Sequence, residues 1–216
     1  MGYEELMKQY AESTSFADEA NSIIGMLDFC KNYGCDKEEI SDIVNDFKER
    51  RLESVDNQAY HELGFIEYQL GTIQGDEALQ TLENARQTYI TRLQMLEDDE
   101  KLETSVIMNN IGNIHMQKAR AYANTTSHDM IMEQRVCPRI PRYLENTDYF
   151  RRQKESGGIN TEEFRKVAVC TWEILVAKKH FAKSYELCSS LDGPQENHEY
   201  AKGLLRHPED VLDTHF

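Results

Sequence analysis

The stretch Ala59-Tyr-His-Glu-Leu-Gly-Phe-Ile-Glu-Tyr-Gln-Leu-Gly71 decides the expected fold, because a second stretch of the chain follows its pattern. The second stretch is Ser105-Val-Ile-Met-Asn-Asn-Ile-Gly-Asn-Ile-His-Met-Gln117. When the two are aligned, Leu63-Gly64 matches Ile111-Gly112. A glycine has no side chain, so each would let a neighbouring helix approach closely. We therefore expect two helices, each with a close-packing glycine on its inner side.

The rest of the chain repeats apolar residues at steps of three and four, which is the period of a helix. Gly34 is placed to stop a helix, and Asp36 with Glu39 has the spacing of a helix start. A second such start is Asn160 with Glu163, after a flexible joint at Gly157-Gly158. In the first half of the chain, helices are expected at about 16–32, 36–51 and 57–70, followed by a turn at 71–75 and a long helix that ends near residue 96. In the second half, helices are expected from about 102, at 142–154 (a short one), at 160–181 and at 182–190. A short terminal helix with a loose tail follows.

These patterns predict an all-α fold made of antiparallel helical hairpins. Sustained alternation of apolar and polar residues is missing, so strands are not expected. Four segments are expected within one continuous helical domain. They are an N-terminal hairpin at 1–55, a pair of repeats at 56–125, an irregular basic connection at 126–159 that contains Pro138 and Pro141, and a C-terminal hairpin and tail at 160–216.

The paired glycine stretches resemble the tetratricopeptide repeat, which has a Leu-Gly pair in its first helix and a small residue early in its second. Ala78, Leu82 and Ala85 would supply the face of that second helix. The resemblance covers residues 57–125 and extends weakly to 160–190. It departs from the family in spacing, because the two glycines are 48 residues apart rather than about 34. Two added turns in each helix would preserve the packing face, as in the longer repeats of kinesin-light-chain-like proteins. A short α-solenoid is the fold that the resemblance implies.

The resemblance also implies a partner-binding groove lined by the first helix of each repeat. In this chain the matching or nearby positions are His61, Phe65, Tyr68, Asn109, Asn110 and Asn113. An amide side chain both donates and accepts, so it can hold a peptide backbone in two directions. A second interpretation stays open, in which the asparagines bridge adjacent helices or face water.

The net charge of −15 is unevenly spread along the chain. Residues 1–117 hold 9 Lys or Arg and 24 Asp or Glu, residues 118–182 hold 12 and 8, and residues 183–216 hold 3 and 7. The acidic first half would repel phosphates, which argues against nucleic-acid binding. The basic stretch 135–154 would face either an acidic partner or the protein's own acidic half.

The cysteine content favours a reducing, cytoplasmic setting. There are five cysteines, an odd count, and the polar N-terminus does not resemble a secretory signal, so reduced thiols are expected. No apolar run reaches the length that crosses a bilayer. Cys30 and Cys35 could serve as metal ligands, but no second close Cys or His pair completes a site, so neither a metal nor a cofactor is expected.

Function is expected to be protein binding rather than catalysis. The chain lacks a His-Glu-x-x-His pattern, a phosphate-cradling glycine loop and a nucleophile elbow. The predicted role is an interaction module, or a scaffold or adaptor subunit of a larger assembly. One alternative is a peptide-sensing regulatory receptor, and another is a helical enzyme that uses His61, Glu62 and Glu67. Because a short repeat array leaves apolar faces at its ends, stable association with itself or other chains is expected.

Overall fold

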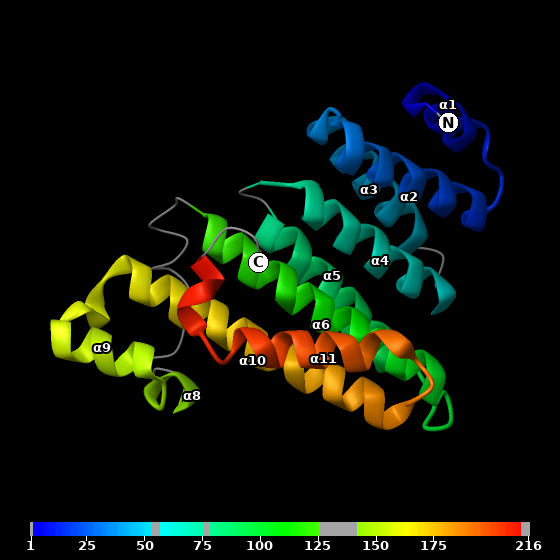
Figure 1. Ribbon diagram of the computed structural model, residues 1–216. Coiled ribbons are helices and arrows are strands. Elements are labelled where there is room, and N and C mark those ends of the chain that lie inside the picture. Colours follow the sequence, from blue (N-terminus) through cyan, green and yellow to red (C-terminus); the bar gives the residue numbers. More distant parts are fainter. Residues whose placement is uncertain (1, 53–56, 76–77, 126–141, 213–216) are drawn as a thin grey trace. The chain divides into compact units, whose positions relative to one another are not determined.

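The computed structural model describes residues 2–52, 57–75, 78–125 and 142–212, and every regular element in these ranges is a helix (Figure 1). The all-α prediction is therefore confirmed for the described residues. The chain forms two compact units, residues 1–98 and residues 99–216, called unit 1 and unit 2 below. The division falls inside the segment 56–125, which was expected to form one pair of repeats.

Unit 1 contains five described helices. They are α1 (Tyr3–Glu12), α2 (Phe16–Tyr33), α3 (Lys37–Leu52), α4 (Asn57–Ile73) and α5 (Ala78–Leu93). The α2–α3 corner forms as the sequence predicts: Gly34 ends α2 with φ 78°, and the Asp36 carboxylate accepts the amides of Glu38 and Glu39. Helix α1 was missed because its residues are mostly polar. Leu6 is its buried anchor, and it lies against Gly25 of α2.

Helices α4 and α5 pack together as a hairpin. A Cβ atom built on Gly64 would lie 3.0 Å from the Tyr89 ring, so the glycine lets the ring approach α4 closely. A Cβ atom built on Gly71 would lie 2.8 Å from the Leu82 side chain. The prediction of a turn at 71–75 is wrong in its first half, because α4 continues to Ile73. Packing against Leu82 keeps Gly71 helical despite its low helix propensity.

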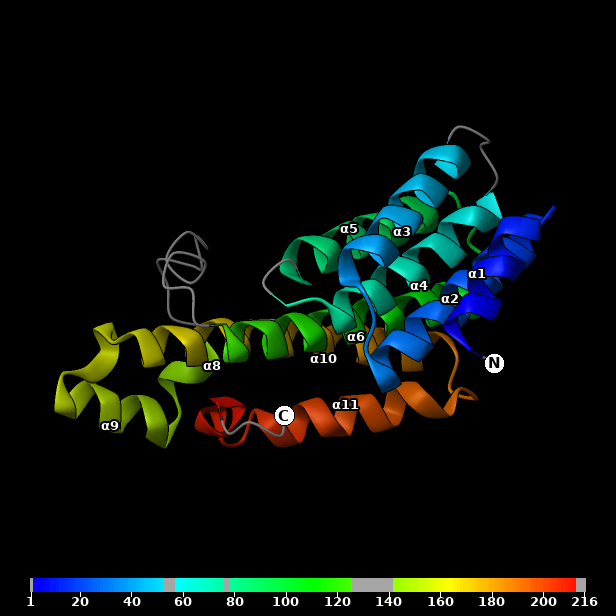
Figure 2. The ribbon, with the colours of Figure 1, turned by 90° about the horizontal axis from the view of Figure 1, so that it is seen from above.

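Unit 2 is built around three long helices that lie side by side, α6 (Lys101–Asn124), α10 (Glu162–Leu187) and α11 (Asp192–Leu204) (Figure 2). Shorter elements complete it. They are α8 (Arg142–Glu145), α9 (Asp148–Ser156), and the 3-10 helices η1 (Gly158–Asn160) and η2 (Pro208–Leu212). Of the predicted basic connection 126–159, residues 126–141 lie outside the described residues. The short helix expected at 142–154 is instead the two helices α8 and α9.

The start and length of α10 differ from the prediction. Thr161, rather than Asn160, caps the helix, since its hydroxyl accepts the Phe164 amide. The two helices expected at 160–181 and 182–190 are one helix, because no helix-breaking residue interrupts the chain near Phe181. The expected joint at Gly157 is an ordered helix end with φ 74°. Left-handed glycine is a frequent C-terminal cap.

The main contact of unit 2 joins α6 to α10. A Cβ atom built on Gly112 would lie only 2.3 Å from the buried Phe181 ring. Buried hydroxyls join the helices as well: Ser105 Oγ donates to the Ser184 carbonyl at 2.8 Å, and Ser184 Oγ donates to the Ser105 carbonyl at 2.7 Å. Both predicted glycines therefore lie on inner faces, as expected.

The two units differ strongly in charge. Unit 1 holds 8 Lys or Arg and 21 Asp or Glu, a net charge of −13, whereas unit 2 holds 16 and 18, a net charge of −2. Almost all of the excess negative charge of the chain therefore belongs to unit 1.

Candidate functional site

Three of the predicted groove residues lie on α4. His61, Phe65 and Tyr68 are all partly exposed, and the rings of Phe65 and Tyr68 are 6.4 Å apart between centroids. The His61 ring meets Tyr89 of α5 edge-on at 5.9 Å. These three residues therefore form a row of partly exposed rings on α4, in which the His61 ring also contacts α5.

Glu67, a residue of the alternative enzyme hypothesis, has a structural role. Its side chain is buried, with Lys48 Nζ of α3 at 2.5 Å and the Thr88 hydroxyl of α5 donating at 2.6 Å. These two contacts join three helices of unit 1 through one carboxylate. Both oxygens of this carboxylate are engaged, so Glu67 is fixed in position between the three helices.

The three asparagines lie on α6, in unit 2. Asn197 Nδ2 of α11 donates to Asn109 Oδ1 at 3.0 Å and lies 3.3 Å from Asn113 Oδ1. Two of the three amides therefore bridge adjacent helices, which is the second interpretation left open by the sequence. Asn110 is also partly buried. The predicted groove residues thus form two separate sets, one in each unit.

A buried polar cluster, missed by sequence reasoning, lies between α6 and α10. His115 Nδ1 lies 2.5 Å from Glu173 Oε2, and Lys118 Nζ lies 3.6 Å from Glu173 Oε1. The His115 ring stacks on the ring of His180 with centroids 5.6 Å apart and planes 11° apart. When the imidazole is neutral, donation from Nδ1–H to the carboxylate leaves Nε2 as an acceptor, which fixes the tautomer.

Cys170 lies three residues before Glu173 on α10. Cys170 is fully buried and its Sγ donates to the Ala119 carbonyl at 3.3 Å. Burial, with a further contribution from the charge of Glu173, raises the pKa of the Cys170 thiol to about 12. Because the thiolate is the reactive form, this cysteine is chemically inert at neutral pH. The cluster therefore holds an imidazole and a carboxylate in fixed positions, and Cys170 does not add a reactive thiolate to them.

The cysteine pair of unit 1 corrects the expectation of reduced thiols. Cys30, at the end of α2, and Cys35, just before α3, form a disulfide. In that state neither sulfur can serve as the thiolate ligand considered for a metal. The expectation failed because it relied on the total count, whereas two cysteines five residues apart can pair across one tight corner. Across the described ranges, no group of three or more His, Cys, Asp or Glu side chains is placed to hold a metal ion.

No protein-family model, no curated protein and no solved structure matches the chain. In the part of the chain that the structure describes, no helix is long and apolar enough to cross a membrane.

Proposed function

We propose that the protein holds another protein, as an interaction module or as a scaffold or adaptor subunit of a larger assembly. The observation that carries the proposal is Trp172, the only tryptophan of the chain, which lies on α10 with 45% of its surface exposed. Tryptophan is enriched among the residues that contribute most to protein-protein affinity, because its large ring buries much apolar surface.

The neighbours of Trp172 indicate the chemistry of the partner. Val176, one turn further along α10, is partly exposed, and Lys179, two turns along, is exposed. Residues spaced four and seven apart share one face of a helix. This face, Trp172–Val176–Lys179, would suit a helix or peptide that offers an apolar side chain next to an acidic one.

The tetratricopeptide-like arrangement remains part of this proposal for unit 1. Its support is the α4–α5 hairpin, with Leu63-Gly64 in the first helix and Ala78 at the start of the second. In unit 2 the corresponding helix α6 packs against α10, which is not the next helix along the chain. We therefore place the repeat-like groove of His61, Phe65 and Tyr68 on unit 1 alone.

Quantitative affinity capture from the native cell tests the proposal. The tagged chain is compared with Trp172→Ala and with Tyr33→Ala, in which a 78% exposed aromatic residue of unit 1 is removed as a matched control. We expect stoichiometric partners that are lost with Trp172→Ala and kept with Tyr33→Ala. The proposal fails if no stoichiometric partner is recovered, or if Trp172→Ala retains the same partners. Far-ultraviolet circular dichroism of each variant confirms that the helices are intact.

A further inference from the structure

The disulfide of unit 1 closes the corner between α2 and α3. Cys30 lies in the last turn of α2, and Cys35 lies two residues before α3, with their Cα atoms 4.8 Å apart. Other groups also hold this corner: the Gly34 amide donates to the Cys30 carbonyl at 2.9 Å, and the Asp36 carboxylate caps α3. The two thiols would therefore stay close together after reduction, so the bond could form again.

The two cysteines differ in access to solvent. Cys30 is only 6% exposed, whereas Cys35 is partly exposed. An external thiolate can therefore reach one side of the bond without unfolding the protein. The cross-linked residues are only five apart in sequence, and a short loop restricts the unfolded chain less than a long one does. Unit 1 can therefore stay folded in both redox forms.

Helix α1 is attached to the chain on both sides of this corner. The rings of Tyr3 and Phe29 are 5.8 Å apart between centroids, and the Tyr3 hydroxyl donates to Glu39 Oε2 at 3.3 Å. Phe29 directly precedes Cys30, and Glu39 follows Cys35 by four residues. Because one tyrosine contacts residues on each side of the disulfide, its two contacts depend on the spacing that the bond maintains.

The rest of α1 is lightly attached to unit 1. Among the described residues of this helix, Leu6 alone is buried, and it lies against Gly25 of α2. Met7 and Tyr10 pack against the same core while staying partly exposed, and the Tyr10 hydroxyl accepts a hydrogen bond from Arg50 at 2.6 Å. Segments with few buried apolar contacts open at the lowest cost in free energy. We therefore expect α1 to be the first helix of unit 1 to detach when the corner loosens.

We propose that the Cys30–Cys35 disulfide is a redox switch that controls the docking of α1 on unit 1. A dithiol reduces the bond in two steps. One thiolate of the dithiol attacks Cys35 Sγ, and Cys30 leaves as a thiolate and takes up a proton. The second thiol of the reductant then attacks the mixed disulfide, which releases Cys35 and closes the reductant's own disulfide. Two electrons and two protons pass to the protein, and the start of α1 detaches while α2 to α5 stay packed.

Hydrogen exchange of the full chain, measured by mass spectrometry of its peptides, tests the switch. The chain treated with oxidised glutathione is compared with the same chain after dithiothreitol at neutral pH without denaturant. We expect reduction to accelerate amide exchange in α1 by about tenfold or more, and to leave exchange in α4 and α5 unchanged. A return to oxidised glutathione should restore the slow exchange of α1.

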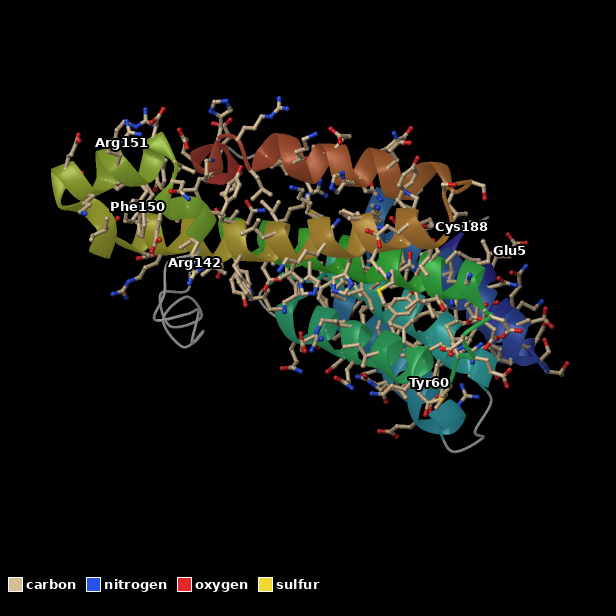
Figure 3. The ribbon with its side chains drawn as sticks, turned by 90° about the horizontal axis from the view of Figure 1, so that it is seen from below. Glu5, Tyr60, Arg142, Phe150, Arg151 and Cys188 are labelled. Carbon is tan, nitrogen blue, oxygen red and sulfur yellow. A yellow bond between two sulfur atoms is a disulfide. The ribbon has the colours of Figure 1, made fainter. Side chains whose placement is uncertain are left out.

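Alkylation with iodoacetamide identifies the sulfur atoms that respond. Cys35 should be labelled only after reduction, whereas Cys188, a free and partly exposed thiol at the end of α10 (Figure 3), should be labelled in both states. Cys35→Ala should show fast exchange in α1 with and without the reductant. Cys188→Ser is the matched control, and its α1 should respond to the reductant as in the wild type.

The switch belongs to unit 1 and does not rest on the proposed binding through Trp172. It is overturned if oxidised glutathione does not form the bond, or if the bond resists dithiothreitol in the folded protein. Equal exchange of α1 in the two redox states would also overturn it. So would an acceleration in α4 and α5 as large as that in α1, because the bond would then support the whole unit rather than the docking of one helix.

Discussion

Gly64 and Gly112 have similar sequence surroundings, yet they meet their aromatic rings in different ways. Gly64 of unit 1 receives Tyr89 from the next helix along the chain. Gly112 of unit 2 receives Phe181 from α10, after the chain has passed through α8, α9 and η1. The same local pattern therefore serves a local hairpin in one unit and a distant helix pair in the other.

The two contacts also differ in tightness. At Gly64 an added Cβ atom would lie 3.0 Å from the ring, and at Gly112 it would lie 2.3 Å away. Both rings are fully buried, so the difference lies in the distance: a small shift of Tyr89 relieves the first contact, whereas the second requires a much larger movement of Phe181. Packing therefore tolerates a small side chain at Gly64 of unit 1 but requires glycine at position 112 of unit 2.

The largest predicted effect comes from a methyl group added at each glycine. Gly112→Ala should destabilise unit 2 by about 2–3 kcal/mol, because overpacking against Phe181 outweighs the better helix propensity of alanine. Gly64→Ala should change the stability of unit 1 by less than about 1 kcal/mol, because the two effects nearly cancel. Urea unfolding measures both, with Trp172 fluorescence reporting unit 2 and circular dichroism reporting both units.

Gly203→Ala is the control for helix propensity, because an added Cβ atom on this glycine of α11 would meet nothing within 4 Å. It should stabilise unit 2 by about 0.5–1 kcal/mol. Equal effects at Gly64 and Gly112 would contradict the difference drawn between the two helix pairs.

The second prediction uses the disulfide to test whether the two units unfold independently. Reduction of Cys30–Cys35 with a dithiol opens a short cross-linked loop, which should lower the stability of unit 1 by about 2 kcal/mol. The transition seen by Trp172 fluorescence should not move, because the cross-link lies in the other unit. Cys35→Ala is the control, since a chain that lacks the bridge should not respond to the reductant. A shift of the Trp172 transition on reduction would show that the units unfold together.

The third and smallest effect concerns a hydroxyl within unit 2. Thr171 on α10 is fully buried, and its Oγ1 has no hydrogen-bond partner in the described residues. Thr171→Val replaces the hydroxyl with a methyl group of similar size and should stabilise unit 2 by about 1 kcal/mol, measured by urea unfolding. Thr88→Val gives the matched comparison in unit 1, because that hydroxyl donates to Glu67 and its loss should be destabilising. A loss of stability in Thr171→Val would imply that the hydroxyl has a partner after all.

Sequence reasoning succeeded where the controlling interaction is local. Gly34 and Asp36 set the end of α2 and the start of α3 within a few residues, and Ala78, Leu82 and Ala85 lie on the buried face of α5 as the sequence predicts. The inner position of both glycines follows from the same periodicity. These features depend on backbone geometry and spacing that can be read directly from the chain.

Sequence reasoning failed where an interaction joins residues that are distant in the chain. The pairing of α6 with α10 brings His115 next to Glu173, and the sequence around either residue does not predict this contact. For the same reason Asn197 could not be foreseen as the amide that engages Asn109 and Asn113. The hydrogen bond from Arg152 of α9 to Glu209 of η2, at 2.7 Å, likewise depends on η2 returning to α9, which local patterns do not specify.

The unequal charge of the two units has a consequence for the kinetics of encounter. With −13 on unit 1 and −2 on unit 2, the long-range field around the molecule comes mostly from unit 1. A basic partner would be drawn toward unit 1 from beyond contact distance, and its association rate constant would fall as ionic strength rises. Capture at low salt would therefore favour basic proteins on unit 1, whereas contacts through an apolar residue such as Trp172 would persist at high salt.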